Sequence, residues 1–368
     1  MNHRLLRGCS TGLKLGVLAI ALAGCAAPAG RSQGGVPPVF ANEREKEVVC
    51  VVERLPNYIT HLTAVAGLPW HTSYADAYGH TVDAESHQIL RRHAPMLQWG
   101  HGFTGDLAPF FVLLPAYLPL EDEFSLFEYM RAVDEAMGSQ QYDAIRDLYP
   151  RQMTRLTWWL FDFEGFFYSR SEVYETYLRA VRQLVHVYEY NYQRWDEEVW
   201  NDAELDLDLA ADELNGQLWS LRLLDTWEEM TGQRFRGNRY EISLTAAPAG
   251  RGITSLGYDR SLLSADQDQA HMLGLIVHEI GTHLLVDLYR EASDRDLKGG
   301  ELDWQTNAAY AGLTAHYTRQ ILPEFETEIE NDVEYFAGIY RQLADEEPQA
   351  DARRLMERAL RQPRTGRW

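Results

Sequence analysis

One stretch of the chain combines a regular hydrophobic pattern with several ionisable side chains. Its apolar residues recur at spacings of three and four, the pattern of an α-helix with one buried face. They are Leu273, Ile276, Val277, Ile280, Leu284 and Leu288. Two histidines and a glutamate, His278, Glu279 and His283, lie off that stripe. Because unpaired buried charge is costly, ionisable residues crowded onto an apolar helix indicate a functional site.

The spacing of these residues, His-Glu-x-x-x-His, is one residue longer than the zinc-protease pattern His-Glu-x-x-His. Five residues of a regular helix turn through about 500°, so the two imidazoles would point roughly 140° apart. Both reach one metal only if the helix is bulged, and Gly281 lies where a bulge causes least crowding. The sequence predicts a metal site with His278 and His283 as ligands and Glu279 as general base. The alternative is a core helix with two incidental histidines.

The segment His278-Glu-Ile-Gly-Thr-His283 resembles the motif of the tubulin-tyrosine-carboxypeptidase-like metallopeptidases. The resemblance implies a zincin of the gluzincin kind, in which both motif histidines and a later glutamate bind Zn²⁺. It also implies that the motif glutamate, Glu279, is the catalytic base. Bacterial relatives of that family carry Gln-Glu-Gly-Leu-Ala downstream, and this chain has no such motif between Gly299 and Leu313.

The third zinc ligand would, by the same resemblance, be a glutamate on or just before the next helix. The candidates in this chain are Glu301, Asp303, Asn307 and His316. Asparagine is a poor zinc ligand, and His316 lies roughly four turns into the next helix. Asp303 has a short reach and is a natural helix N-cap, whereas Glu301 follows two glycines that allow close approach. We favour Glu301 as the third ligand, with Asp303 next.

The first 24 residues have the features of a bacterial signal peptide. A basic front precedes an apolar run from Leu15 to Gly24, which is well short of the about 20 residues that span a membrane. The run ends in Leu22-Ala-Gly-Cys25, the signature of a lipoprotein cleaved before a cysteine that is then lipidated. We therefore predict a signal peptide over residues 1–24 and a lipid on Cys25.

The residues after the cleavage site predict where the protein resides. Residue 26 is alanine rather than aspartate, which in a Gram-negative host resembles lipoproteins sorted to the outer membrane. Residues 25–41 are rich in Pro, Gly, Ala and Ser, which indicates a lipidated Cys followed by a flexible tether. The sequence thus predicts a cell-envelope protein, held by its lipid on the outer membrane and facing the periplasm.

Two parts with different patterns follow the tether. Residues 42–232 are predicted to form a helical lobe, with an apolar, proline-containing stretch at 102–119 as buried irregular structure. The helical patterns in this lobe cover Glu85–Trp99, Phe124–Met137, Gln141–Met153, Ser171–Tyr192 and Leu207–Thr231.

Residues 233–368 are predicted to form a zincin-like metal-binding lobe. Tyr240–Ala246 alternates as a half-buried strand does, and Ile253–Tyr258 is a second short strand. Zincins place an edge strand beside the metal helix, where an extended peptide can add as a further strand. After the motif helix, helical patterns cover Leu302–Ile321, Glu328–Leu343 and Ala350–Arg361. The predicted fold class is α+β, predominantly α-helical, with a small sheet beside the metal-binding helix.

Charge and cysteine content narrow the class of protein. The net charge is −21, and it becomes −24 once the signal peptide and its three basic residues are removed. Such a chain repels nucleic acid, so a nucleic-acid partner is excluded. Cys9 is lost with the signal and Cys25 is acylated, so Cys50 remains alone and no intramolecular disulfide forms. The apolar run Val48–Val52 predicts that Cys50 is buried and structural.

Other catalytic patterns are missing from the chain. It has no Gly-x-Ser-x-Gly elbow, no phosphate-binding glycine loop and no Cys-x-x-Cys pair. The predicted function is a membrane-anchored zinc hydrolase, a metallopeptidase acting on peptides or proteins of the cell envelope through metal-activated water. The alternative is a non-catalytic envelope lipoprotein that serves as a binding or scaffold module.

Overall fold

The structure, a computed structural model, describes residues 46–67, 72–99, 105–159, 174–247, 252–257, 259–296, 303–325 and 331–362. Most of this part of the chain is helical. The helices are α1 (Arg54–Val65), α2 (Thr72–Tyr78), η1 (Gly79–Thr81), α3 (Ala84–Leu97), η2 (Pro109–Leu113), α4 (Leu114–Tyr117), α5 (Glu123–Ser139), α6 (Asp143–Leu148), α7 (Pro150–Trp159), α9 (Tyr174–Tyr190), α10 (Tyr192–Trp195), η4 (Asp196–Trp200), α11 (Asn201–Leu221), α12 (Leu223–Thr231), α13 (Gln269–Asp296), α14 (Asp303–Ile321), α15 (Asn331–Glu346) and α16 (Ala352–Leu360). The predicted signal peptide, Cys25 and the tether lie outside the described residues.

Four strands form one mixed sheet in the order β1-β2-β4-β3. They are β1 (Glu47–Val52), β2 (Arg239–Thr245), β3 (Ile253–Gly257) and β4 (Arg260–Ser264). β1 and β4 both run parallel to β2, whereas β3 runs antiparallel to β4. Parallel neighbours need a crossover, and the connection from β1 to β2 contains all the helices from α1 to α12.

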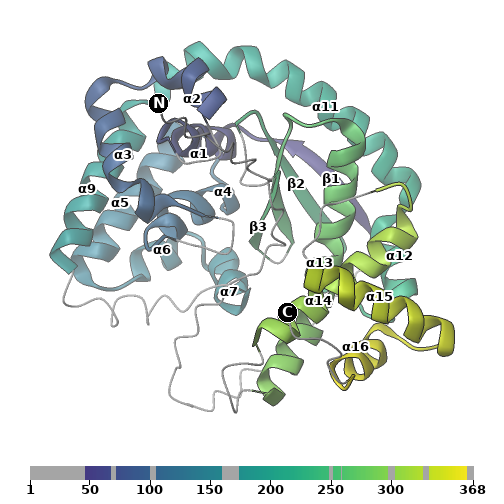
Figure 1. Ribbon diagram of the computed structural model, residues 1–368. Coiled ribbons are helices and arrows are strands. Elements are labelled where there is room, and N and C mark those ends of the chain that lie inside the picture. The colour runs from purple at the N-terminus through teal and green to yellow at the C-terminus, as the bar shows by residue number, and fades with distance from the viewer. Residues whose placement is uncertain are drawn as a thin grey trace, which may run out of the picture.

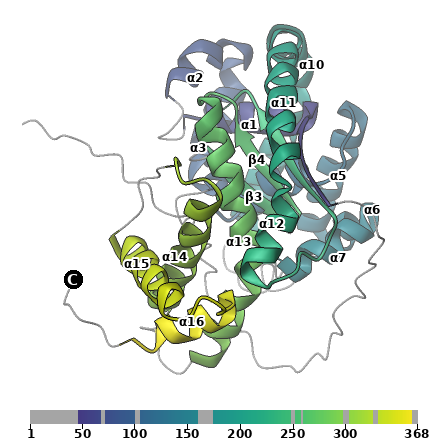
Figure 2. The same ribbon diagram turned by 90° about the vertical axis from the view of Figure 1, so that its right-hand side faces the viewer.

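The sheet lies between two groups of helices (Figure 1). On one side α1 packs on β2 and α4 on β3, and on the other α11 packs on β1 and α13 on β3. Figure 2 shows α13 alongside β3 and β4, with α14, α15 and α16 beyond it. The stretch Gln269–Ser293 of α13 is long and apolar enough to cross a membrane. However, 83% of its most apolar 18-residue segment is buried in the protein, as in a core helix.

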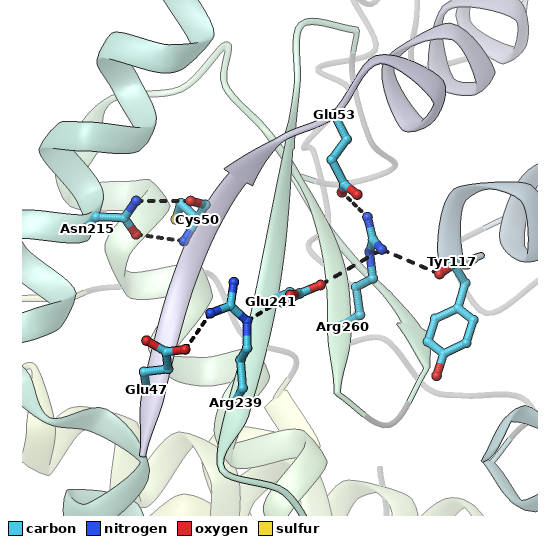
Figure 3. A network of polar contacts seen from close by, with 8 residues as sticks. All are labelled: Glu47, Cys50, Glu53, Tyr117, Asn215, Arg239, Glu241 and Arg260. Atoms are coloured by element: carbon cyan, nitrogen blue, oxygen red, sulfur yellow. Dashed lines mark hydrogen bonds and ion pairs between the residues drawn. The ribbon is translucent and has the colours of Figure 1, made fainter. Parts of the chain in front are cut away.

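The outer edge of the sheet at β1 is closed by a side chain (Figure 3). The Asn215 side chain on α11 accepts a hydrogen bond from the Cys50 N–H (2.7 Å) and donates one to the Cys50 carbonyl (3.0 Å). This amide therefore takes the place that a further strand would take. Cys50 itself is buried, as predicted, and burial raises the pKa of its thiol to about 12.

The predicted α+β, mainly helical class is confirmed, with a small mixed sheet. Two strands, β1 and β4, were not predicted. β1 belongs to the predicted helical lobe (42–232) yet pairs with β2 of the predicted zincin-like lobe (233–368), so one sheet draws strands from both segments. The described part of the proline-containing stretch, residues 105–119, is mostly buried and contains short helical pieces, the π-helix η2 and one turn of α4.

Candidate functional site

The glutamate of the motif and its second histidine lie on the face of α13 that packs against the sheet. Glu279 Oε1 is 3.1 Å from His283 Nε2, one helical turn away. The Ser261 hydroxyl on β4 donates to the same oxygen at 3.0 Å, and the Ser255 hydroxyl on β3 lies 2.9 Å from His283 Nε2. All four side chains are buried. We refer to Tyr240, Ser255, Ser261, Glu279 and His283 as the Glu279 cluster.

The sheet register brings the cluster together. Ser255 and Ser261 are directly opposite each other in the β3–β4 pair, so both hydroxyls face the same helix. Tyr240 on β2 completes the cluster, because its hydroxyl lies 2.6 Å from the Ser261 hydroxyl and its ring meets His283 edge-on at 4.9 Å. β3 and β4 thus each present one hydroxyl to the Glu279–His283 pair, and β2 adds the Tyr240 ring against His283 and the Tyr240 hydroxyl against Ser261.

The carboxylate of Glu279 is held in its charged form. Burial by itself raises its pKa, but the hydrogen bonds from His283 and Ser261, together with the charge of His283, lower the pKa of Glu279 below its ordinary value. Burial and, after it, the negative charge of Glu279 raise the pKa of Tyr240. The site therefore holds an ionised carboxylate that is only 3% exposed.

The first histidine of the motif points elsewhere. His278 Nδ1 lies 3.5 Å from the Thr318 hydroxyl on α14, at the limit of a hydrogen bond. Burial lowers the pKa of His278, and the charge of Glu279 opposes this effect. The same helix pair is joined one turn later, where the Tyr310 hydroxyl of α14 donates to the Thr282 carbonyl. His278 belongs to the α13–α14 interface, and His283 belongs to the α13–sheet interface.

The predicted bulge at Gly281 is not present, because α13 is α-helical throughout Gln269–Asp296. Gly281 has a different physical role. A Cβ there would lie 2.2 Å from the ring of Trp227 on α12, so only glycine lets this fully buried ring reach the helix. Without a bulge, the five-residue spacing leaves the two imidazoles on different faces.

A single zinc ion bound by both histidines does not fit this arrangement, because one imidazole faces Thr318 and the other faces Ser255. Within the residues that the structure describes, no group of three or more His, Cys, Asp or Glu could hold a metal. Glu301 lies outside the described residues, and Asp303 begins α14.

His316, the further candidate for the third ligand, contacts Gln320 at 2.7 Å and packs near Tyr340 of α15. It is two residues from Thr318, about 200° around α14, and so faces away from His278. Zn²⁺ with the ligands His278, His283 and Glu301 stays a prediction.

A second polar cluster lies on the opposite face of the sheet (Figure 3). Arg260, next to Ser261 on β4, pairs with Glu53, lies 3.9 Å from Glu241, and donates to the Tyr117 carbonyl at 3.4 Å. Burial lowers the pKa of Arg260 to about 10. Its Nε has no hydrogen-bond partner within the described structure. Arg260, Glu53 and Glu241 form the Arg260 cluster.

Sequence reasoning missed Ser255, Ser261 and Thr318. The alternation of β2 does place Tyr240 on one face with Ile242 and Leu244, which is a signal for Tyr240. No comparable signal marks the serines, because their role depends on the β3–β4 register. Chemically, the Glu279 cluster offers an ionised carboxylate, an imidazole and hydroxyl groups at hydrogen-bonding distance. Compared with models of protein families, with curated proteins and with solved structures, the chain matches none.

Proposed function

We propose that this protein is a hydrolase of peptide bonds, with Glu279 as the general base and Zn²⁺ as its cofactor. The observation that carries the proposal is the position of the Glu279 carboxylate, which is buried beside the His283 imidazole and the Ser261 hydroxyl where α13 meets the sheet. A general base must be unprotonated and within reach of the proton that it takes. The described contacts of the carboxylate use Oε1, which makes Oε2 the oxygen that can take the proton from an attacking water.

The neighbouring edge strand supports a peptide substrate. β3 is the antiparallel edge of the sheet, and its Ser255 touches His283. Ser264 N–H donates to the Gly252 carbonyl, so the alternation of an antiparallel ladder turns the backbone groups of Ile253 and Ser255 away from β4. Because β3 is buried along most of its length, an extended peptide can pair with this edge once the side chains that cover it move aside. A peptide bond placed there would lie beside the Glu279 cluster.

Zinc binding by His278 and His283 requires a change in α13. The turn between the two histidines would have to leave its α-helical geometry before both imidazoles could meet one ion. We therefore assign no catalytic step to the metal. Glu279 would take a proton from water as the water oxygen adds to the peptide carbonyl carbon, and would pass that proton to the amine nitrogen as the C–N bond breaks, while Ser261 and His283 hold the carboxylate in place.

The test is peptide cleavage by the purified full-length protein. A mixture of unstructured peptides is incubated with it, and new termini are detected by mass spectrometry. Glu279→Gln should lower the rate about 10²–10⁴-fold, because an amide cannot accept the proton. Glu228→Gln is the matched control, since that carboxylate is equally buried but pairs with Lys46 and Arg234. A folded Glu279→Gln protein that cleaves at the wild-type rate would exclude Glu279 as the base.

Metal content tests the cofactor separately. The wild-type protein should contain about one zinc per chain, and the His278→Ala, His283→Ala double variant should contain none. Glu301→Ala should weaken zinc binding strongly if Glu301 is the third ligand. An unchanged affinity would move that assignment to Asp303, because His316 faces away from His278.

A second candidate function is a non-catalytic envelope lipoprotein that binds or organises other molecules. One observation favours it: the polar groups of the Glu279 cluster satisfy one another inside the protein, as in a purely structural core network. A wild-type protein with neither zinc nor cleavage activity would support this function over the hydrolase.

For either function we propose that the protein is anchored in the cell envelope by a lipid on Cys25, on the outer membrane and facing the periplasm. Leu22-Ala-Gly-Cys25 supports this proposal. Cys25→Ser should abolish labelling by a radioactive fatty acid in a bacterial host. Unchanged labelling would exclude the lipid anchor.

A further inference from the structure

Helix α11 buries one face and leaves a second apolar face uncovered. Its buried residues pack towards β1, and they are Leu207, Ala211, Leu214 and Leu218. On a helix of 3.6 residues per turn, a second set of residues falls on the opposite side. That set is Leu205, Leu209, Asp212, Gly216 and Trp219, which we call the α11 outer face. Figures 1 and 2 place α11 at the outside of the molecule, with the sheet on its inner side.

The apolar side chains of the α11 outer face are among the most exposed in the described structure. Leu205 is 67% exposed, Leu209 56% and Trp219 70%. They take no part in packing α11 onto the sheet, because the buried face lies on the other side of the helix. Gly216 adds a shallow place between Leu209 and Trp219, since a Cβ there would meet nothing within 4 Å. Single exposed apolar residues are common, but three on one stripe form a continuous surface.

The surroundings of this stripe are strongly acidic. Between Arg194 and Arg222 the chain contains no Lys, Arg or His. The carboxylates carried by α11 itself are Asp202, Glu204, Asp206, Asp208, Asp212 and Glu213. None of the ion pairs found within the described residues involves any of them, although acids on α6, η4, α12 and α15 pair with arginines. The stripe is thus an apolar surface within an uncompensated negative field.

From this combination we propose that the α11 outer face is a docking site for a basic, amphipathic helix of another protein. Leu205 and Leu209 are four residues apart and Trp219 follows nearly three turns later on the same side, so the three form an apolar stripe along which a partner helix can lie. The span from Leu205 to Trp219 is about 21 Å, which is about four turns of the partner. The acidic flanks select Lys and Arg on the partner. They also disfavour anionic lipid and a second copy of this chain, which carries the same charges.

The proposal is independent of the hydrolase function, because the α11 outer face lies on the side of α11 away from the sheet and the Glu279 cluster. The probe is a fluorescein-labelled 18-residue peptide of leucine and lysine with an amphipathic helical pattern. Its binding to the full-length protein is followed by fluorescence anisotropy. A peptide of the same pattern with glutamate in place of lysine controls for apolar attraction alone.

The expected result is saturable binding of the lysine peptide, weakened at least tenfold in the triple variant Leu205→Ser, Leu209→Ser, Trp219→Ala. Phe124→Ala is the matched control, because Phe124 is also 70% exposed but lies on α5. The Phe124→Ala protein should bind the lysine peptide with the wild-type affinity. Asp206→Asn with Asp212→Asn should weaken binding and reduce its dependence on salt. Triple-variant affinity within twofold of wild type would overturn the proposal, because the peptide would then be bound by charge alone.

Two further measurements test whether a second copy of this chain or a lipid surface binds the α11 outer face instead. Analytical ultracentrifugation should find the wild-type protein and the triple variant in the same oligomeric state. A wild-type dimer that the triple variant loses would make the α11 outer face a self-association surface and overturn the proposal. Co-sedimentation of the Cys25→Ser protein with phosphatidylcholine vesicles should likewise be absent, and sedimentation that depends on Trp219 would reassign the face to lipid.

Discussion

The two polar clusters on the two faces of the sheet begin from adjacent residues of β4 and differ in their access to water. Arg260 turns to one face and Ser261 to the other. In the Arg260 cluster the side chains of Glu53 and Glu241 remain about one-third exposed. In the Glu279 cluster both members of the ion pair are nearly inaccessible, at 3% and 1% for the side chains of Glu279 and His283.

This difference in exposure changes what happens when a partner of each carboxylate is removed. Carboxylates that reach water can be solvated when their partner is lost. The Arg260 side chain links β4 to β2, to Glu53 just after β1 and to the last residue of α4. A buried carboxylate with only an imidazole and hydroxyls around it has no such alternative. Burial of an ionised acid is costly, and a role in binding or catalysis gives it a reason.

The largest expected effect comes from removing the partner of the buried acid. His283→Leu keeps the volume but leaves the Glu279 charge with the Ser261 hydroxyl as its main donor. We expect a loss of about 3–5 kcal/mol in the free energy of unfolding, measured with urea. His278→Leu is the same substitution on the other face of α13 and should cost less than about 1 kcal/mol, because its contact to Thr318 is at the limit of a hydrogen bond. Equal costs would remove the distinction between the two faces.

Breaking the Arg260 cluster should cost less. Arg260→Met removes the guanidinium and leaves Glu53 and Glu241 free to turn towards water, so we expect about 1.5–3 kcal/mol. The measurement is again urea unfolding, and peptide cleavage should be unchanged per folded molecule. If Arg260→Met lowered the free energy of unfolding as much as His283→Leu does, the two clusters would be equally shielded from water.

Overpacking of α13 against α12, behind the Glu279 cluster, should lower the free energy of unfolding by as much as Arg260→Met or less. Gly281→Ala adds a methyl group where the Trp227 ring already lies, and overpacking of this kind costs about 1–3 kcal/mol. Gly216→Ala is the control, since it lies in a helix with open space around it and should stabilise the protein by up to about 1 kcal/mol. Thermal unfolding of both variants compares them directly, and a stable Gly281→Ala protein would show that α12 can move away.

The smallest expected effect is a change, at acidic pH only, in the stability difference between the wild-type protein and Glu279→Gln. Because the pKa of Glu279 in the folded protein is lowered, its charge stabilises the fold fully above the ordinary glutamate pKa of about 4.3. That contribution is lost as the pH falls through the lower, folded pKa. The stability difference between wild type and Glu279→Gln should therefore be constant above about pH 5 and shrink towards pH 3. A difference that is independent of pH would show that Glu279 is not ionised in the folded protein.

Helices with a regular spacing of apolar residues could be predicted from the sequence, whereas the points at which such a helix is interrupted could not. The helices at α3, α5, α9 and α13 follow from apolar spacing alone. Leu207–Thr231, predicted as one helix, is two, because Arg222 adopts a left-handed backbone (φ 45°) that ends α11. β1 was missed although Val48–Val52 is an uninterrupted apolar run, since such a run fits a buried strand and a buried helix equally.

The candidate site could be predicted in its central residues but not in its geometry. The pattern His-Glu-x-x-x-His marks Glu279 and His283, which the structure brings together. It does not mark Ser255 or Ser261, because a hydroxyl enters the site only through the pairing of β3 with β4. It also does not reveal that Gly281 admits Trp227, since contact between α12 and α13 is set by tertiary packing.

The side-chain amide of Asn215 protects the β1 edge of the sheet from pairing with a strand of another molecule. With the N–H and C=O of Cys50 already occupied, a strand from another molecule must first displace Asn215 before it can join β1. The other edge strand, β3, is buried along most of its length, so a guest strand there would have to displace packed side chains instead. The two edges of the sheet are thus protected in different ways, β1 by the hydrogen bonds of one asparagine and β3 by burial.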